Sequence, residues 1–267
     1  MIYINSLIKY ELIELVAGNK ISDLQSRQGY NQHFISRQFF LMRLALFDLD
    51  NTLLAGDSDH AWGEYLIKRG LVDAQHHAEA NDRFYADYQT GTLDIHAYVR
   101  FTLSPIMSKT LAELALMHKE FMAEFIEPMV LPKAKALVEQ HKAAGDRTVI
   151  ITATNTFITQ AIAENFGVDT LLGTDLVVQA EHFTGEISGT PCFQEGKVKK
   201  LRSWLDNETT LSAAASGLRI EDGIFYTDSI NDLPLLEQVA EPIVVDGDSK
   251  LTQVAAQRRW RQISLRN

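Results

Sequence analysis

Residues 44–52 read Leu44-Ala45-Leu46-Phe47-Asp48-Leu49-Asp50-Asn51-Thr52, a short apolar run that passes directly into polar residues. An unbroken apolar run of this length is typical of a parallel strand that is buried on both faces. Ligands of open α/β sheets bind beyond the carboxyl ends of such strands. The stretch therefore predicts a central strand that delivers the side chains of Asp48, Asp50 and Thr52 to a site.

Strand and helix patterns alternate after this first strand. Further buried strands are predicted over residues 148–151, 223–226 and 242–245, and helices over 130–144, 155–166, 196–205 and 249–260. A hairpin is predicted over 175–187, with its turn at Phe183-Thr184-Gly185. This alternation predicts an α/β fold with a doubly wound, Rossmann-like parallel sheet.

A long insert separates the first strand from the next element of the sheet. Its patterns are helical only, over residues 58–69, 74–89, 93–101 and 109–125. A structureless loop of that length is uncommon in a compact domain. We therefore predict a helical cap over 55–127, inserted into a core made of 42–54 and 128–267.

Residues 1–41 differ from the rest in their polar, weakly patterned composition. We interpret them as an N-terminal extension that is disordered or does not belong to the native protein. The alternative is a genuine arm that packs on the core.

The composition excludes several classes of protein. The net charge of -10 argues against a general nucleic-acid binder, which needs a basic surface. Cys192 is the one cysteine, so no disulfide forms within the chain, and we interpret it as a buried or incidental thiol. No apolar run is long enough for a membrane span and the N-terminus is a poor signal peptide, so we predict a cytoplasmic location with no membrane partner.

Polar residues also follow the other predicted strands. Thr152, Ala153 and Thr154 follow the second strand, Lys197 opens a later helix, and the third strand is followed by Asp228, Ser229, Asn231 and Asp232. Clustered carboxylates repel one another unless a cation lies among them, and Mg²⁺ prefers oxygen ligands. A carboxylate nucleophile, a metal, a hydroxyl and an ammonium together suit phosphoryl transfer through a covalent intermediate.

These segments resemble the motifs of the haloacid dehalogenase superfamily. The first motif is matched by Asp48-Leu49-Asp50-Asn51-Thr52, the second by Thr152, the third by Lys197 and the fourth by Asp228-Ser229-Ile230-Asn231-Asp232. The helical insert after the first motif resembles the cap of the phosphoserine phosphatase-like subclass, subfamily IB. The resemblance covers about residues 43–245.

The resemblance implies a Mg²⁺-dependent phosphatase and a role for each residue. Asp48 would be the nucleophile, and Asp50 would protonate the leaving oxygen and then activate water. Mg²⁺ would be bound by Asp48, the main-chain carbonyl of Asp50 and Asp228, with Asp232 orienting either Lys197 or a metal-bound water. Phosphate would be bound by Thr152, Ala153, Lys197 and Asn231.

Several of these residues also have a purely structural interpretation. Lys197 lies beside Lys199 and Lys200 and could be a surface lysine. Asn231 and Asp232 could be helix N-caps. Asp57 stands at the spacing where phosphoserine phosphatases hold an acid that contacts the substrate amine, and it could equally cap a helix. The remaining candidates are more typical of surface or packing residues: His60, His76, His77, Arg83 and Arg100.

Two other functions use similar residues. Phosphoacceptor receiver domains also place an aspartate at a strand end, but they lack an acid two residues later and a large cap. A mutase, which transfers phosphate to a sugar hydroxyl, would use the same catalytic groups.

The predicted substrate is a small phosphorylated metabolite. Thr152-Ala153 replaces the Ser-Gly pair that is usual in phosphoserine phosphatases, and Thr227 and Ser229 flank Asp228 where glycines are usual. We therefore carry histidinol phosphate and phosphoserine as candidates and favour histidinol phosphate slightly. The pattern does not predict an oligomeric state.

Overall fold

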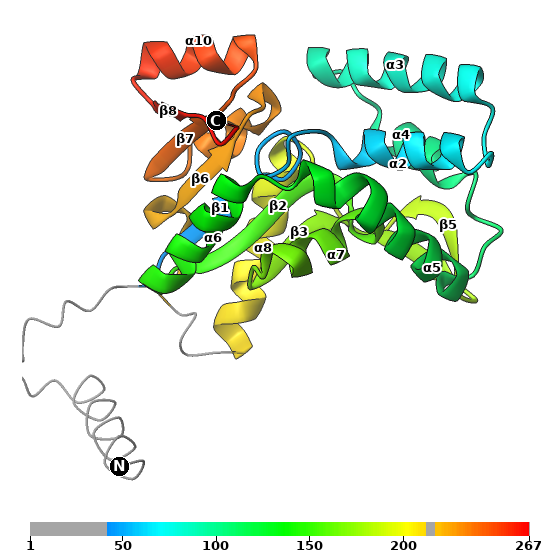
Figure 1. The fold of residues 1–267 in the computed structure, drawn as a ribbon. Coiled ribbons are helices and arrows are strands. Elements are labelled where there is room, and N and C mark those ends of the chain that lie inside the picture. The colour runs from blue at the N-terminus through cyan, green and yellow to red at the C-terminus, as the bar shows by residue number, and fades with distance from the viewer. Residues whose placement is uncertain (1–41, 212–216, 267) are drawn as a thin grey trace, which may run out of the picture. The chain divides into compact units, whose positions relative to one another are not determined.

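A six-stranded parallel sheet lies at the centre of residues 42–211 and 217–266, which are the residues that this computed structural model describes (Figure 1). Its order is β3-β2-β1-β6-β7-β8. The strands are β1 (Leu44–Phe47), β2 (Arg147–Asn155), β3 (Thr170–Thr174), β6 (Ile224–Thr227), β7 (Glu241–Val245) and β8 (Arg261–Ile263). All pairs are parallel, which confirms the predicted fold class and adds β3 and β8 at the two edges.

Helices cover both faces of this sheet because successive side chains of its strands point to opposite sides. In β1, Phe47 packs in the cluster that contains Ile158 of α7, whereas Leu46 packs in the cluster that contains Leu201 of α8. One face carries α6 (Pro132–Ala144) and α7 (Thr156–Phe166); the other carries α8 (Glu195–Leu211), α9 (Leu233–Leu236) and α10 (Ser249–Arg258).

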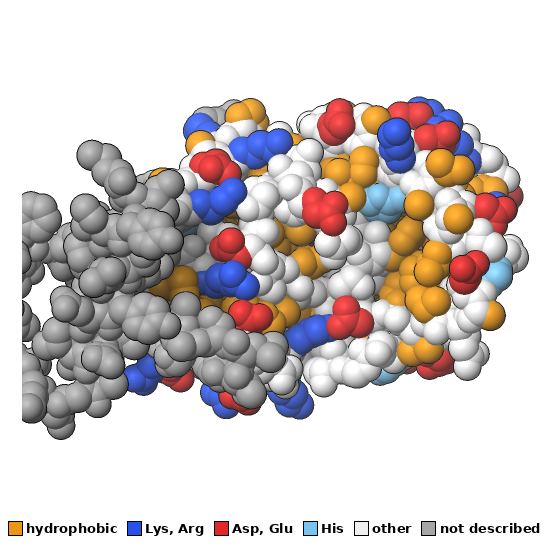
Figure 2. Space-filling model, turned by 90° about the horizontal axis from the view of Figure 1, so that it is seen from below, with side chains coloured by type: hydrophobic (Ala, Val, Ile, Leu, Met, Phe, Trp, Pro, Cys, Tyr) orange, Lys and Arg blue, Asp and Glu red, His pale blue; other side chains and the backbone are white. Residues whose placement is uncertain are grey.

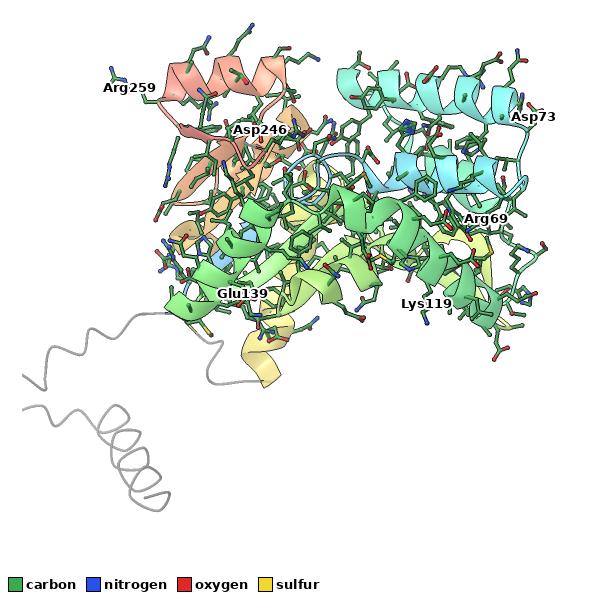
Figure 3. The ribbon with its side chains drawn as sticks, viewed as in Figure 1. Arg69, Asp73, Lys119, Glu139, Asp246 and Arg259 are labelled. Carbon is green, nitrogen blue, oxygen red and sulfur yellow. The ribbon has the colours of Figure 1, made fainter. Side chains whose placement is uncertain are left out.

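The insert after β1 is helical and gathers at one end of the sheet (Figure 1). It contains α2 (Ser58–Lys68), α3 (Ala74–Thr90), α4 (Ile95–Leu103) and α5 (Leu111–Phe121), with a π-helical turn over Met122–Ile126 and a 3-10 turn over Glu127–Met129. Each of the four helices begins after an N-cap residue whose side chain accepts backbone N–H groups: Asp57, Asp73, Asp94 and Thr110. Figure 3 labels one of them, Asp73, at the start of α3.

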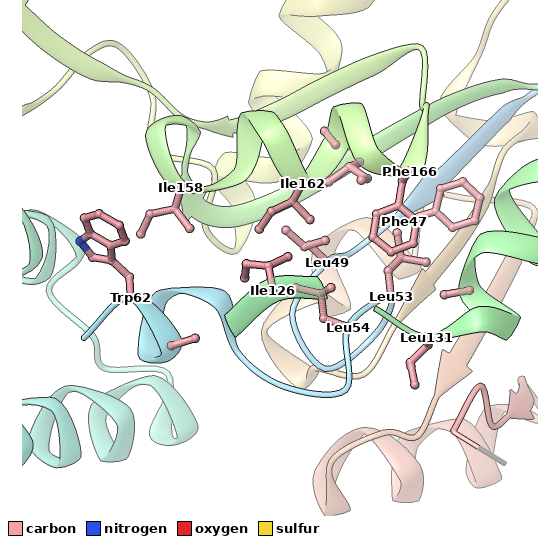
Figure 4. Close-up of a cluster of buried hydrophobic side chains, with 14 of the residues drawn as sticks. Phe47, Leu49, Leu53, Leu54, Trp62, Ile126, Leu131, Ile158, Ile162 and Phe166 are labelled. Atoms are coloured by element: carbon pink, nitrogen blue, oxygen red, sulfur yellow. The ribbon is translucent and has the colours of Figure 1, made fainter. Parts of the chain in front are cut away.

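The insert and the core share one apolar cluster (Figure 4). Trp62 of α2 is 1% exposed, and its ring lies 5.1 Å from Phe121 of α5 and 5.2 Å from Phe157 of α7. Aromatic pairs at such distances add to the free energy of burial. The base of the cap is therefore packed on the core, and the domain boundaries at 54/55 and 127/128 stay a prediction.

The hairpin differs from the prediction in its turn. Its strands are β4 (Leu176–Gln179) and β5 (His182–Ile187), joined by Ala180 and Glu181, which have φ values of 46° and 64°. A two-residue turn with positive φ at both positions matches the twist of the strands. Gly185, the expected turn residue, has φ 83° inside β5, where the pairing register shifts. The glycine marks a bulge in the strand.

The predicted extension over residues 1–41 lies outside the described residues. None of the helices formed by the described residues has the length and apolar character of a membrane span. On the face drawn in Figure 2, acidic and basic side chains are interspersed and do not gather into a basic patch.

Trp62→Ala should lower the free energy of unfolding by about 3–5 kcal/mol, because it leaves a cavity where the cap packs on the core. Leu116→Ala is the control, since Leu116 of α5 is 70% exposed and its loss should change stability by no more than about 0.5 kcal/mol. Urea denaturation of both variants measures the difference. Equal losses would contradict a shared apolar cluster.

Candidate active site

A cavity of about 790 Å³ lies where the carboxyl ends of β1, β2 and β6 meet the cap. All the site residues predicted from the sequence line it: Asp48, Asp50, Asp57, Thr152, Ala153, Lys197, Asp228, Asn231 and Asp232. The cap contributes acidic and aromatic side chains to the same cavity, among them Asp59, Asp82, Phe84, Tyr85, Tyr88 and Tyr98.

Lys197 lies buried between two carboxylates. Its Nζ donates to Asp48 Oδ1 at 2.9 Å and to Asp232 Oδ2 at 2.8 Å, and its side chain is 3% exposed. The N-terminal turn of α8 presents it to the end of β1. This placement excludes a surface lysine. Because Asp232 also accepts from Thr227 Oγ1 at 2.6 Å, its carboxylate is fixed as a support for Lys197.

Asp50 takes no part in this ion pair, and its carboxylate accepts hydrogen bonds from neutral donors. Its Oδ1 accepts from the backbone N–H of Ser58 at 2.6 Å, and its Oδ2 accepts from Thr154 Oγ1 at 2.8 Å and Thr152 Oγ1 at 3.4 Å. These bonds connect the end of β1 to the first residue of α2 and to β2. Asp48 and Asp50, two residues apart, thus have different environments.

Asp228 follows β6 on the other side of Asp48. Its Oδ1 accepts from Thr52 Oγ1 at 3.1 Å, and its own N–H donates to the same hydroxyl at 3.0 Å. Among the described residues, no three His, Cys, Asp or Glu side chains form a ready-made metal-binding group. Two carboxylates with one main-chain carbonyl still fit Mg²⁺, because this ion keeps several waters and needs few protein ligands.

Burial is the main cause of the raised pKa values of these acids, because it penalises the charged form. Burial raises the pKa of Asp48 from 3.8 to about 7, against the effect of Lys197 and with help from Asp232. Burial, with Asp48 and Asp232, raises the pKa of Asp228 well above its usual range. A cation between Asp48 and Asp228 would reverse both shifts. The donor set therefore fits a hard dication.

Asn231 and Asp57 both take part in contacts with the cap. Asn231 donates from Nδ2 to Tyr88 O at 3.0 Å and accepts from Gln194 Nε2 at 3.2 Å, so its amide joins the core to the end of α3. Asp57 Oδ1 accepts the N–H groups of Asp59 and His60, each at 2.9 Å. Asp57 therefore caps α2 while it lines the cavity.

Sequence reasoning missed the residues that close the cap. Tyr88 donates from its hydroxyl to Ser229 Oγ at 3.1 Å, and Gln194 donates to Gly91 O at 3.3 Å. Neither residue stands at a recognisable motif position, because the contact depends on how α3 meets the loops after β5 and β6.

Of the remaining polar candidates, His60 lines the cavity, whereas the two arginines and His77 do not. Arg83 is exposed on α3, and Arg100 is 52% exposed and 3.8 Å from Glu186; neither lines the cavity. His77 is buried against Phe101, with ring centroids 4.7 Å apart. Cys192 is fully buried, which confirms the prediction of a buried thiol, and burial raises the pKa of the thiol to about 12.

A family model for haloacid dehalogenase-like hydrolases matches residues 45–237 of the chain. The chain belongs to this family. A histidinol-phosphatase of Neisseria meningitidis serogroup C is 44% identical over 222 residues, which cover 82% of this chain and 97% of that protein. Membership of this family and the similarity to this relative confirm the prediction of a phosphatase. They argue against the alternative of a phosphoacceptor receiver domain.

Two solved structures are similar in fold. A protein of unknown function from Bordetella pertussis Tohama I has a TM-score of 0.76 at 39% identity, with 84% of this chain and 99% of that chain covered. A substrate-bound phosphoserine phosphatase has a TM-score of 0.59 at 16% identity, with 79% and 90% covered. The second likeness confirms the resemblance in fold to the phosphoserine phosphatase-like subclass.

In EDTA, the stability of the wild type relative to Asp48→Asn should fall as pH rises from about 4 to about 7. The pKa of Asp48 is raised from 3.8 to about 7 by folding, so in that interval the folded state binds a proton that the unfolded state has lost. Ionising the buried carboxyl therefore costs stability as pH rises, and asparagine has no proton to lose.

Urea denaturation of both proteins at intervals between pH 4 and pH 8 measures this difference. If the wild type instead became more stable relative to Asp48→Asn as pH rises, Lys197 would be holding the pKa of Asp48 below its ordinary value, contrary to the expectation.

Proposed function

We propose that this chain is a Mg²⁺-dependent phosphomonoesterase that forms an aspartyl-phosphate on Asp48. The observation that carries the proposal is that two carboxylates in one cavity have different hydrogen-bond partners. Asp48 is paired with a buried lysine, whereas Asp50 is held by a backbone N–H and two threonine hydroxyls. One acid is thereby suited to attack phosphorus and the other to transfer protons.

In this mechanism Asp48 attacks the phosphorus atom, and the ester oxygen leaves. Lys197 and Thr152, which both line the cavity floor, bind the phosphoryl oxygens, whose charge must be stabilised during in-line transfer. Asp232 acts through Lys197: it fixes the ammonium by an ion pair of 2.7 Å.

Asp50 donates a proton to the leaving alcohol and later removes one from the water that hydrolyses the aspartyl-phosphate. Burial and nearby Asp57 raise the pKa of Asp50 to about 6. A pKa near neutrality suits a group that must act first as an acid and then as a base. The bond from Ser58 N–H places this carboxylate at the entrance of the cap.

The residues that would hold Mg²⁺ are Asp48, Asp228 and the main-chain carbonyl of Asp50. When bound, the ion supplies positive charge to the phosphoryl group and to the acidic cluster. Thr52 keeps Asp228 oriented for this role through its hydroxyl.

The cavity favours histidinol phosphate over phosphoserine as the substrate. Among the described residues, the cap lines it with acids, aromatic rings and His60 but with no Lys or Arg. A substrate carboxylate would meet negative charge there, whereas an amine would meet complementary charge. The Neisseria relative is named for the same substrate.

Asp48→Asn should abolish turnover while the fold persists, because the amide has nearly the same shape and is a poor nucleophile. Asp50→Asn should instead accumulate a phosphorylated chain, because water attacks slowly without a base. Intact-mass spectrometry after mixing with substrate detects the added phosphoryl group.

Full activity in Asp48→Asn would refute the nucleophile. Activity that EDTA leaves undiminished would refute the metal requirement.

The kcat/KM for L-histidinol phosphate should exceed that for L-phosphoserine by at least about tenfold, the factor that one unfavourable charge contact of about 1.4 kcal/mol produces. Assays of the purified enzyme with Mg²⁺ on both esters and on p-nitrophenyl phosphate make the comparison. Similar values on all three would indicate a generalist phosphatase, and a preference for phosphoserine would contradict the substrate assignment.

A further inference from the structure

Three side chains of the core make hydrogen bonds to the end of α3. Ser229 Oγ accepts from the Tyr88 hydroxyl at 3.1 Å. Asn231 Nδ2 donates to Tyr88 O at 3.0 Å, and Gln194 Nε2 donates to Gly91 O at 3.3 Å. The last carbonyls of a helix have no donor one turn further along the same helix, so the two amides of the core satisfy groups that α3 leaves open.

Ser229 connects this contact to the short turn that carries Asp232. Its Oγ also accepts from Asn231 N–H at 3.3 Å and so caps the 3-10 turn over Ile230–Asp232. Its own N–H donates to Thr227 Oγ1 at 3.1 Å. Because the Tyr88 hydroxyl donates to the same Ser229 oxygen, the cap helps to hold Ser229 in the orientation that caps this turn.

The hydrogen bonds continue from this turn to the nucleophile. Thr227 Oγ1 donates to Asp232 Oδ2 at 2.6 Å, and both residues are buried. Asp232 accepts in turn from Lys197, whose Nζ also donates to Asp48. A connected set of hydrogen bonds therefore extends from Tyr88 of the cap to the Asp48 carboxylate, and buried bonds of this kind support one another.

The ring and the hydroxyl of Tyr88 have different partners. The ring packs on Phe193, with centroids 5.8 Å apart, and a phenylalanine at position 88 would keep that contact. Ser229 stands beside Asp228 at a position where phosphoserine phosphatases usually have glycine. Glycine has no hydroxyl, so the bond to Tyr88 depends on a residue that departs from their pattern.

Resting on the proposed function, we infer that Tyr88 is a positioning residue for phosphoryl transfer. By donating to Ser229, its hydroxyl orders the loop over residues 227–232, and this loop orients Lys197 beside Asp48. Tyr88 acts through Ser229 and is not itself a catalytic group. Lys197 is then fully oriented only while the cap covers the cavity, so that exclusion of water is coupled to the chemical step.

Steady-state kinetics of Tyr88→Phe on p-nitrophenyl phosphate with Mg²⁺ test the inference. The kcat should fall about three- to tenfold, the loss expected for one neutral hydrogen bond. The KM should change by less than about twofold, because the bond supports the transition state and not the binding of the ester. Tyr65→Phe is the matched control: it removes a cap hydroxyl that donates to Glu120 at 3.1 Å outside the cavity, and kcat should not change.

A double variant shows whether Tyr88 acts through Ser229. Ser229→Ala removes the acceptor and should lower kcat at least as much as Tyr88→Phe. The double variant should be no slower than Ser229→Ala alone, because both substitutions remove the same bond. Losses that multiply in the double variant would overturn the inference, since Tyr88 would then act on another group.

Hydrogen exchange of the backbone amides separates this inference from the proposed function, because it needs no turnover. Amides of residues 227–232 should exchange about three- to tenfold faster in Tyr88→Phe than in the wild type, and at the wild-type rate in Tyr65→Phe.

Faster exchange in a protein that hydrolyses no phosphate ester would support the ordering of the loop by Tyr88 and refute the phosphatase proposal. With an active wild type, an unchanged exchange rate or an unchanged kcat in Tyr88→Phe would overturn the positioning role and leave the phosphatase proposal standing.

Discussion

The ion pair of Lys197 with Asp48 and Asp232 is the interaction on which the site depends. Removing charged groups from water costs several kcal/mol for each ion, so a buried lysine persists only between partners of good geometry. Here Nζ lies 2.9 Å from Asp48 and 2.7 Å from Asp232. The three residues come from α8, the end of β1 and the loop after β6. These three side chains therefore meet only because the parallel sheet brings the three segments together.

The order of the sheet explains why one positive charge is not enough. β1 lies between β2 and β6, so the residues that follow all three strands meet at one edge. Asp48, Asp50 and Asp228 arrive there together, and burial together with neighbouring acids raises the pKa of each. The proposed metal ion, held by Asp48 and Asp228, would lower these pKa values again.

The sequence predicted the parts that depend on local pattern. The strand over residues 44–47 follows from an apolar run, the cap helices follow from helical patterns, and the candidate site residues follow strands or open a helix. The edge strands β3 and β8 were not predicted, because Thr170–Thr174 contains a glycine and Arg261–Ile263 is too short to show a pattern. The contacts of Tyr88 and Gln194 depend on how α3 packs against the loops of the core, which spacing along the chain does not encode.

The cap is joined to the core by two contacts of different strength. Its base is joined by an apolar cluster around Trp62, whose disruption exposes a large buried side chain to water. The end of α3 is joined by neutral hydrogen bonds from Tyr88, Asn231 and Gln194. Each such bond contributes only about 1 kcal/mol, because water replaces it when the contact opens. Closure over the cavity is thus the weaker contact, which suits a site that admits a metabolite and excludes water during phosphoryl transfer.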